Sequence, residues 1–489
     1  MKNRELISMF LPNLSWNCVV MVVGFRRLLV LTATSFICLS LANTTILVRG
    51  DDSDSRLKAG AAMRVVNPTR PAVTIGHRVM ERFTNIYVDL RVQAMVLEDS
   101  DGRQVVWMGV DFCVLRHRVV DHIKQEIQKA HGIEPASICI NASHTHSAPP
   151  LTADLAVLPE HLDQQYSDRV LNEAVAVVGD AIDRLEPARV RYALDHCQVG
   201  ISRRLLRDGK LLFLPNPEGV VDHRVQLVVA ESCETEKLIG VAVKYACHPV
   251  TIVGLGLGSD YPGYMRKFVE QRHPGAVAVF LQGCGADVRI RAVNDDMTDW
   301  VDGDFAMAER FGAELANAVE RGLNRVADDV VEVTGPIRAA YHQVKLPVEP
   351  FEDAVYQQAA EVNDTFSGNW GRRFSKLIAD GKPIPHTIPY RIQTFHFGTS
   401  DNGLKVIALD GEVFTEYGLK LEQILGRGPF IALGYSNGVV TYIPTARAMV
   451  EGGYETTAFR YFLVPGPFRK DVEQRILNAA IRVAKQLDR

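Results

Sequence analysis

Strand-like and helix-like hydrophobic patterns alternate along most of this chain. Residues 87–97 alternate apolar and polar side chains, as a half-buried strand does, and residues 104–110 form an apolar run. Residues 116–130 then carry apolar side chains at helical spacing, namely Val119, Val120, Ile123 and Ile127. A second apolar run follows at residues 137–140. This strand–helix–strand order predicts a βαβ unit with two parallel strands.

The alternation continues to the last helical stripe. Further helices are predicted at residues 169–185, 264–272, 305–326 and 471–487, and further strands at 224–230, 238–245, 276–281, 406–412 and 430–434. We therefore expect one large α/β domain over residues 60–489. Its core is expected to be a mixed, largely parallel β-sheet flanked by helices.

The first 42 residues have the pattern of an export signal. An arginine pair at 26–27 precedes an apolar stretch at 28–41, and Ser40-Leu41-Ala42 fits a small-residue cleavage site. Apolar residues resume at 46–48, so an uncleaved membrane anchor is the alternative. We expect an exported protein, secreted or periplasmic, in which residues 43–59 form a flexible segment.

Composition narrows the choice of partner. The chain has 489 residues and a net charge of −4, so no basic surface suggests nucleic acid. A small molecule or a lipid is the expected substrate, while contact with a membrane surface and the oligomeric state stay open. Six cysteines lie beyond residue 42 without a Cys-x-x-Cys pair, so disulfide pairing also stays open.

The segment Asn141-Ala-Ser-His-Thr-His-Ser-Ala-Pro149 follows the strand predicted at 137–140. His144 and His146 are two positions apart, so extended backbone would point them to the same side. Neutral imidazole is a common ligand of zinc. These two histidines therefore suggest a metal site at the carboxyl end of a strand, where open α/β sheets place their chemistry.

Other strands deliver polar residues in the same way. His248 follows the strand at 238–245, Glu412 follows an apolar run and a glycine turn, and Asp287 lies shortly after the strand at 276–281. Each has an ordinary structural explanation by itself: a packed histidine, a solvated turn residue or a buried polar group. If the strands are parallel, however, their ends converge on one face and the residues could share one site.

Four segments resemble motifs of the neutral/alkaline (non-lysosomal) ceramidase family. They are Asn141–Pro149, Tyr245-Ala-Cys-His-Pro249, Gly411-Glu412 and Tyr442-Ile-Pro-Thr445, in the family's order. The resemblance implies a catalytic domain that holds one Zn²⁺ and cleaves the amide bond of ceramide, a step of sphingolipid metabolism. It implies four zinc ligands: His144, His248, Glu412 and Tyr442.

The resemblance also implies a catalytic role for His146 and a substrate-facing arginine in Gly200-Ile-Ser-Arg203. Arg204 is adjacent, which leaves that alignment open by one residue. The chain departs from the family where a catalytic serine is expected, because Arg289 stands there, two residues after the retained Asp287. The immunoglobulin-like domain that usually follows in the family is not expected here.

The working hypothesis is a zinc hydrolase in which a metal-activated water attacks an amide. His146 or Asp287 would move the proton to the leaving amine, and Arg203 would bind a polar substrate group or the developing oxyanion. Two alternatives remain: a hydrolase with Cys284 as nucleophile, and a non-catalytic homologue that binds a lipid or glycan. Arg289 either favours a more polar or anionic substrate or pairs with Asp287.

Overall fold

The computed structural model describes residues 56–75, 81–152, 161–325, 330–363, 366–399 and 402–488. The expected export signal and most of the segment 43–59 lie outside these ranges. Strand β1 (Leu57–Val65) begins inside that segment, so its residues 57–59 belong to a sheet. Within the ranges described, none of the helices combines the length and the apolar character needed to cross a bilayer.

A nine-stranded sheet forms the larger half of the core. Its strands lie in the order β13-β11-β10-β6-β1-β3-β4-β5, and β15 pairs with β6. Their bounds are β3 (Arg91–Glu98), β4 (Gln104–Val110), β5 (Ile138–Ala142), β6 (Glu186–His196), β10 (Arg224–Ser232), β11 (Leu238–Tyr245), β13 (Val277–Gln282) and β15 (Val331–Glu332).

Parallel pairing occurs at the two edges of this sheet. At one edge β4 and β5 are parallel and joined through α1 (His117–His131), which confirms the expected βαβ unit. At the other edge β11 and β13 are parallel, with α3 (Asp260–Arg272) between them in the chain. The ladders from β11 to β4 are antiparallel. The mixed α/β core is therefore confirmed, but its parallel share is smaller than expected, because short turns such as the one between β3 and β4 reverse the chain.

A second sheet has the order β16-β17-β18-β20. Its strands are β16 (Ile337–Pro347), β17 (Thr387–Phe397), β18 (Lys405–Leu409) and β20 (Phe430–Leu433). The inner faces of the two sheets pack together: Trp107 of β4 meets Phe395 and Phe397 of β17 edge-on, at centroid distances of 6.2 and 5.6 Å. Alternate residues of β4 serve the two faces, since Val106 and Met108 belong to the opposite cluster.

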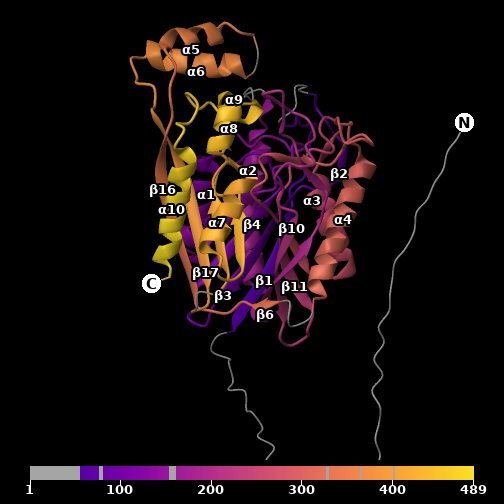
Figure 1. Cartoon of the computed structure of the whole chain (residues 1–489). Coiled ribbons are helices and arrows are strands. Elements are labelled where there is room, and N and C mark those ends of the chain that lie inside the picture. The colour runs from indigo at the N-terminus through magenta and orange to yellow at the C-terminus, as the bar shows by residue number, and fades with distance from the viewer. Residues whose placement is uncertain are drawn as a thin grey trace, which may run out of the picture. The chain divides into compact units, whose positions relative to one another are not determined.

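Helices cover both outer faces. On the large sheet, α2 (Gln164–Ile182) packs against β1 and β3, and α4 (Phe305–Leu323) packs against β6 and β10. On the second sheet, α10 (Val472–Gln486) packs against β16 and β17, and α7 (Thr415–Leu425) packs against β20. The result is a four-layered α/β/β/α arrangement (Figure 1).

Shorter elements complete the fold. Helices α5 (Asp353–Ala360) and α6 (Ser367–Ala379) form a hairpin between β16 and β17 at one end of the molecule (Figure 1). Two-stranded pairs are β2 (Ile86–Val88) with β12 (Leu257–Gly258), β7 (Gly200–Ser202) with β14 (Val288–Ile290), β8 (Leu205–Arg207) with β9 (Lys210–Leu212), and β19 (Glu412–Val413) with β21 (Tyr442–Ile443). The short helices α8 (Ala446–Glu451) and α9 (Tyr454–Thr457) follow β21.

Candidate metal centre

His144 lies in the loop after β5, in a left-handed conformation with φ +65°. That region is uncommon for residues other than glycine, and such strain concentrates at functional sites. The loop is fixed by backbone hydrogen bonds, from Ser143 N to Val110 O at 2.9 Å and from His144 N to Phe112 O at 3.1 Å. The buried imidazole is thereby held at the carboxyl end of the parallel pair β4–β5.

His248 follows β11 and is held in a similar way. Its backbone N donates to Val288 O at 3.1 Å. Its Nδ1 lies 3.0 Å from both Gly285 O and Val288 O, and Nδ1 of His144 lies 2.6 Å from Cys113 O. A carbonyl can only accept, so both rings carry a hydrogen on Nδ1. Both Nε2 atoms are then free to present a lone pair, as in a metal-binding histidine.

Glu412 and Tyr442 come from the paired strands β19 and β21, where they stand directly opposite each other. The Glu412 Oε2 atom lies 3.2 Å from His144 Nε2 and 3.1 Å from His248 Nε2. The Tyr442 hydroxyl lies 3.5 Å from His248 Nε2, and the Tyr435 hydroxyl lies 3.5 Å from Glu412 Oε2. All four residues expected from the sequence as zinc ligands therefore meet in one buried cluster.

The donor set fits a zinc ion. One ligand atom from each of His144, His248 and Glu412 lies within 4.8 Å of the others. In a tetrahedral zinc site with bonds near 2.0–2.2 Å, ligand atoms lie about 3.3 Å apart, close to the separations from Glu412. Acceptor atoms facing one another in a buried space need a cation or a proton between them.

Protonation competes with metal at this cluster. Burial would lower the pKa of His144, but Cys113 and Glu412 raise it well above its usual range. Burial would raise the pKa of Glu412, but the two histidines hold it well below its usual range. For His248, burial and then Arg203 lower the pKa to about 4. A metal must displace the proton on His144, so we expect binding to weaken in acid.

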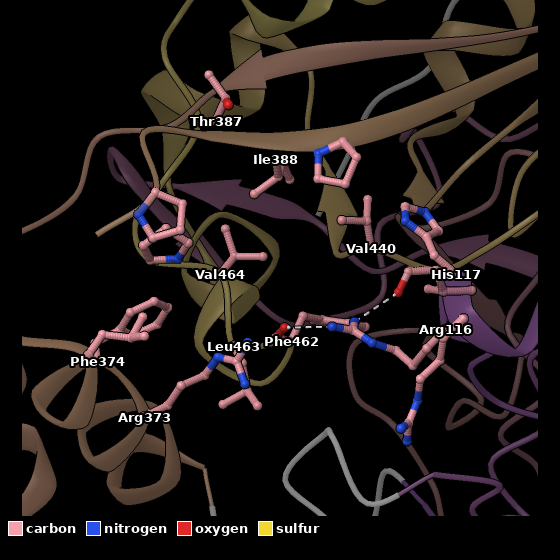
Figure 2. Close-up of a pocket in the computed structure, with 16 residues that line it drawn as sticks. Arg116, His117, Arg373, Phe374, Thr387, Ile388, Val440, Phe462, Leu463 and Val464 are labelled. Atoms are coloured by element: carbon pink, nitrogen blue, oxygen red, sulfur yellow. Dashed lines mark hydrogen bonds between the residues drawn. The ribbon is translucent and has the colours of Figure 1, made fainter. Parts of the chain in front are cut away.

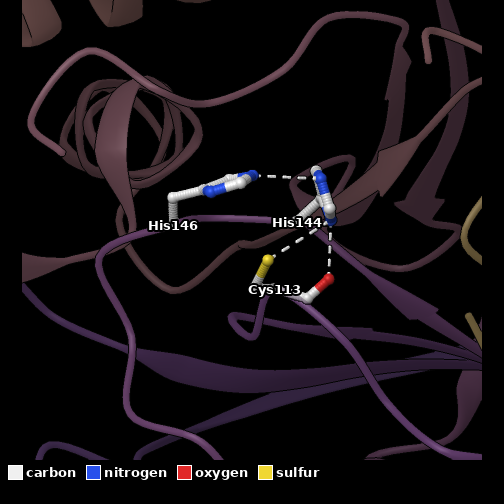
Figure 3. Close-up of side chains that lie close together, drawn as sticks. All are labelled: Cys113, His144 and His146. Atoms are coloured by element: carbon white, nitrogen blue, oxygen red, sulfur yellow. Dashed lines mark hydrogen bonds between the residues drawn. The ribbon is translucent and has the colours of Figure 1, made fainter. Parts of the chain in front are cut away.

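His146 lies beside the cluster without joining its closest group. Its Nε2 is 3.1 Å from His144 Nε2, and the two rings meet edge-on (Figure 3). Burial and the neighbouring rings of His144 and His248 lower the pKa of His146 well below its usual range. His146 is therefore a neutral imidazole beside the candidate metal cluster, and its lowered pKa also makes it a weak base.

Arg203 reaches the cluster through Tyr442. Its Nη2 donates to the Tyr442 hydroxyl at 3.1 Å, and its Nε donates to Glu455 Oε1 at 2.9 Å. Arg204 instead donates to Glu455 Oε2 at 2.5 Å and to Gly452 O at 2.9 Å. Of the two adjacent arginines, Arg203 is the one that contacts a candidate ligand.

Asp287 and Cys284 have other surroundings. The Asp287 carboxylate accepts hydrogen bonds from Thr415 N at 2.9 Å and Thr415 Oγ1 at 2.8 Å, which fixes the start of α7. Cys284 packs in the core, and its β-carbon and sulfur would each lie 3.6 Å from a β-carbon on Gly418. Burial raises the pKa of the Cys284 thiol to about 12, which disfavours the thiolate that a nucleophile needs.

Arg289 does not pair with Asp287. Its guanidinium lies over the ring of Trp300, 4.7 Å from the centroid. Burial and then Arg203 lower the pKa of Arg289 to about 10, so the group is still a cation at neutral pH.

The structure adds neighbours that sequence reasoning missed. Cys113 presents its carbonyl to His144, and Glu455 holds both Arg203 and Arg204. The Tyr454 ring packs edge-on against Tyr442 at a centroid distance of 5.6 Å. Glu455 and Tyr454 lie in a short helix after β21 with no apolar strand before them, so no pattern marked them.

A neighbouring pocket has its own lining, although its wall residue Phe462 packs edge-on against Tyr442 at a centroid distance of 6.0 Å. Its volume is about 330 Å³, and its walls combine Arg116 and Arg373 with apolar groups such as Ile388, Phe462 and Val464 (Figure 2). Arg116 donates to the carbonyls of Val439 and Phe462, both at 3.4 Å. No candidate zinc ligand lines this pocket. The candidate metal site is therefore identified by its ligand atoms and not by this pocket.

Comparison with solved structures gives the fold a known counterpart. A crystal structure of neutral ceramidase from Pseudomonas aeruginosa matches with a TM-score of 0.70 at 17% sequence identity, over 89% of this chain and 75% of that chain. A ceramidase complexed with C2 matches with a TM-score of 0.69 at 17% identity, over the same shares of the two chains. No protein-family profile and no curated protein sequence matches the chain. The fold implied by the sequence motifs is thus confirmed, while the chemistry is argued from the site.

Proposed function

We propose that this chain, which has the fold of neutral ceramidase, is a zinc-dependent hydrolase that cleaves an N-acyl amide bond. The single observation that carries the proposal is the buried meeting of His144, His248 and Glu412, with one ligand atom of each within 4.8 Å of the others. Tyr442 would complete the set of zinc ligands. When bound, zinc would polarise the scissile carbonyl and lower the pKa of a bound water to about 7.

The remaining groups have distinct roles in this proposal. His146, neutral and half-buried beside the cluster, takes a proton from the attacking water and returns it to the leaving amine. Arg203, fixed by Glu455, offers a guanidinium N–H where negative charge develops on the carbonyl oxygen. Asp287 is the weaker candidate for proton transfer, because Thr415 already occupies its carboxylate.

The proposed substrate class follows from the fold. Similar solved structures are ceramidases, so ceramide or a related N-acyl amide is the proposed substrate. No serine nucleophile is needed for hydrolysis by water, so Arg289 in place of a serine is compatible with the proposal.

The decisive experiment measures metal content and activity together. We expect about one zinc per chain in the purified protein, and chelator-sensitive hydrolysis of a fluorescent N-acyl sphingosine. His144→Ala and His248→Ala should each lose the zinc, while the matched control Cys284→Ala should keep it. Zinc retained in both histidine variants would contradict the proposed ligands. Zinc without hydrolysis would keep the metal site and contradict ceramide as substrate.

A further inference from the structure

Arg289 stands between two parts of the candidate site. It lies in β14, whose residues Val288 and Arg289 pair with Ser202 and Ile201 of β7, next to Arg203. On its other side Arg289 forms a backbone bridge with His248. Its place is therefore set by the same backbone that holds a candidate metal ligand and the proposed oxyanion donor.

A continuous wall of aromatic and cationic side chains runs from Tyr442 to Arg289. The Arg203 guanidinium lies 5.6 Å from the centroid of Tyr442 and 5.1 Å from that of Phe213. The Phe213 ring is 6.2 Å from that of Trp300, whose Nε1 donates to Phe213 O at 2.9 Å. At the other end of the wall, the Arg289 guanidinium lies 4.7 Å from the ring centroid of Trp300. Phe213 is 42% exposed, so this wall reaches solvent.

The positive charges along this wall are not equally compensated. Arg203 and Arg204 share the carboxylate of Glu455. Among the residues that the structure describes, Arg289 has no carboxylate within ion-pair distance, and its buried Nε has no hydrogen-bond partner. The nearby carboxylate that raises the pKa of Arg289 is that of Asp302. Asp302 is exposed and forms no ion pair with Arg289 within the described ranges. A largely buried cation is normally paired.

We propose that Arg289 binds an anionic group of the substrate. The inference rests on the proposed amide hydrolysis and narrows its substrate class. A hydrocarbon acyl chain carries no charge, so the anion belongs to the amine part, as in an N-acyl amino acid. Hydrolysis then adds water across the C–N bond: the acyl carbon takes the hydroxyl, the nitrogen takes the proton, and a fatty acid and a free amino acid are released. A planar guanidinium suits bidentate binding of a carboxylate.

The test compares two probes that differ mainly in charge, N-dodecanoyl-glycine and the neutral N-dodecanoyl-ethanolamine. We expect Arg289→Ser to lower the ratio of kcat/KM for the anionic probe over the neutral probe by about 10- to 100-fold. Arg310→Ser is the matched control, because Arg310 also lies over an aromatic ring, Phe311 at 4.9 Å, but on the outer helix α4. It should leave the ratio unchanged.

A binding measurement separates this inference from the proposed function. If the zinc-loaded wild type cleaves neither these probes nor the fluorescent N-acyl sphingosine, the proposed function fails, and calorimetric titration of both probes still decides the role of Arg289. Tighter binding of the anionic probe, lost in Arg289→Ser and kept in Arg310→Ser, supports the inference. Equal losses for both probes, or no change in Arg289→Ser, overturn it. Unchanged zinc content and melting temperature show that the variants are folded.

Discussion

At the scale of single residues, the two histidines of the metal cluster are oriented by hydrogen bonds from their Nδ1 atoms to backbone carbonyls outside the cluster. Cys113, Gly285 and Val288 each offer a backbone carbonyl to Nδ1 of a histidine, which leaves Nε2 for the centre. The histidines and Glu412 stand out in the sequence because they follow strand-like runs, but the full ligand set with Tyr442 is implied only by the resemblance to ceramidase motifs. The carbonyls could not be predicted, since any residue carries one. Glu455 could not either, because it lies 252 positions from Arg203 and its contact exists only in the folded chain.

His146→Ala tests whether His144 binds zinc while His146 transfers a proton. We expect zinc content to stay near that of the wild type, because His146 is not among the four proposed ligands. The kcat should fall by about 100- to 1000-fold through the loss of proton transfer. Metal analysis and steady-state kinetics on one preparation check both parts, with the exposed His196→Ala as control. A variant that loses its zinc would make His146 a ligand.

At the scale of elements, the pairing of β19 with β21 does most to assemble the metal cluster. It places Glu412 opposite Tyr442, so one short parallel pair supplies two of the candidate ligands. Gly411 makes the turn into β19 with φ +86°, and a β-carbon there would lie 2.7 Å from Thr441 O. Both the conformation and the space therefore require glycine at this position.

Gly411→Ala should displace Glu412 as well as strain the backbone. We expect the free energy of unfolding to fall by about 2 kcal/mol or more, and zinc affinity to fall at least tenfold. Gly102→Ala is the control, because Gly102 also has φ +77° but open space around its α-carbon. It should cost about 1 kcal/mol and leave zinc affinity unchanged. Denaturant unfolding and competition with a zinc chelator measure the two quantities. Equal zinc affinity in both variants would contradict this role of Gly411.

Sequence patterns predicted most of these elements but not how they combine. The strands at 238–245, 276–281 and 430–434 appear close to their expected bounds as β11, β13 and β20. Apolar runs do not tell which strand pairs with which, so neither the second sheet nor the antiparallel ladders could be predicted. The candidate ligands converge because two sheets meet, not because all the strands lie in one parallel sheet.

At the scale of the whole molecule, a partly buried charge network connects the large sheet to the helix that covers the second sheet. Asp222 accepts from Arg224 Nε at 2.7 Å and from Lys244 Nζ at 2.6 Å, both in the large sheet. Arg224 also donates to Glu422 Oε1 at 2.7 Å, on the helix α7 that covers the second sheet. Asn141 adds a second link, since its Nδ2 donates to Gln282 O at 3.1 Å and to Gly434 O at 2.8 Å.

Asp222→Asn should reveal this network through acid stability. Burial would raise the pKa of Asp222, but Lys244 and Arg224 hold it below its usual value. The carboxylate therefore contributes stability above the unfolded pKa of about 3.9, and this contribution is lost as pH falls through the folded pKa. We expect the variant to be less stable by about 3 kcal/mol at pH 7, with the difference shrinking below about pH 4. Urea unfolding at several pH values checks this, and a difference that grows in acid would contradict it.

The chain positions of the candidate ligands have a consequence for biosynthesis. Ribosomes deliver residues 144 and 248 well before residues 412 and 442, and chains begin to fold while they are still being made. Until the paired strands β19 and β21 emerge, a nascent chain offers zinc only the two histidines of the proposed set. The proposed hydrolase would thus be inactive during translation, and a chain truncated before residue 412 would never acquire hydrolytic activity.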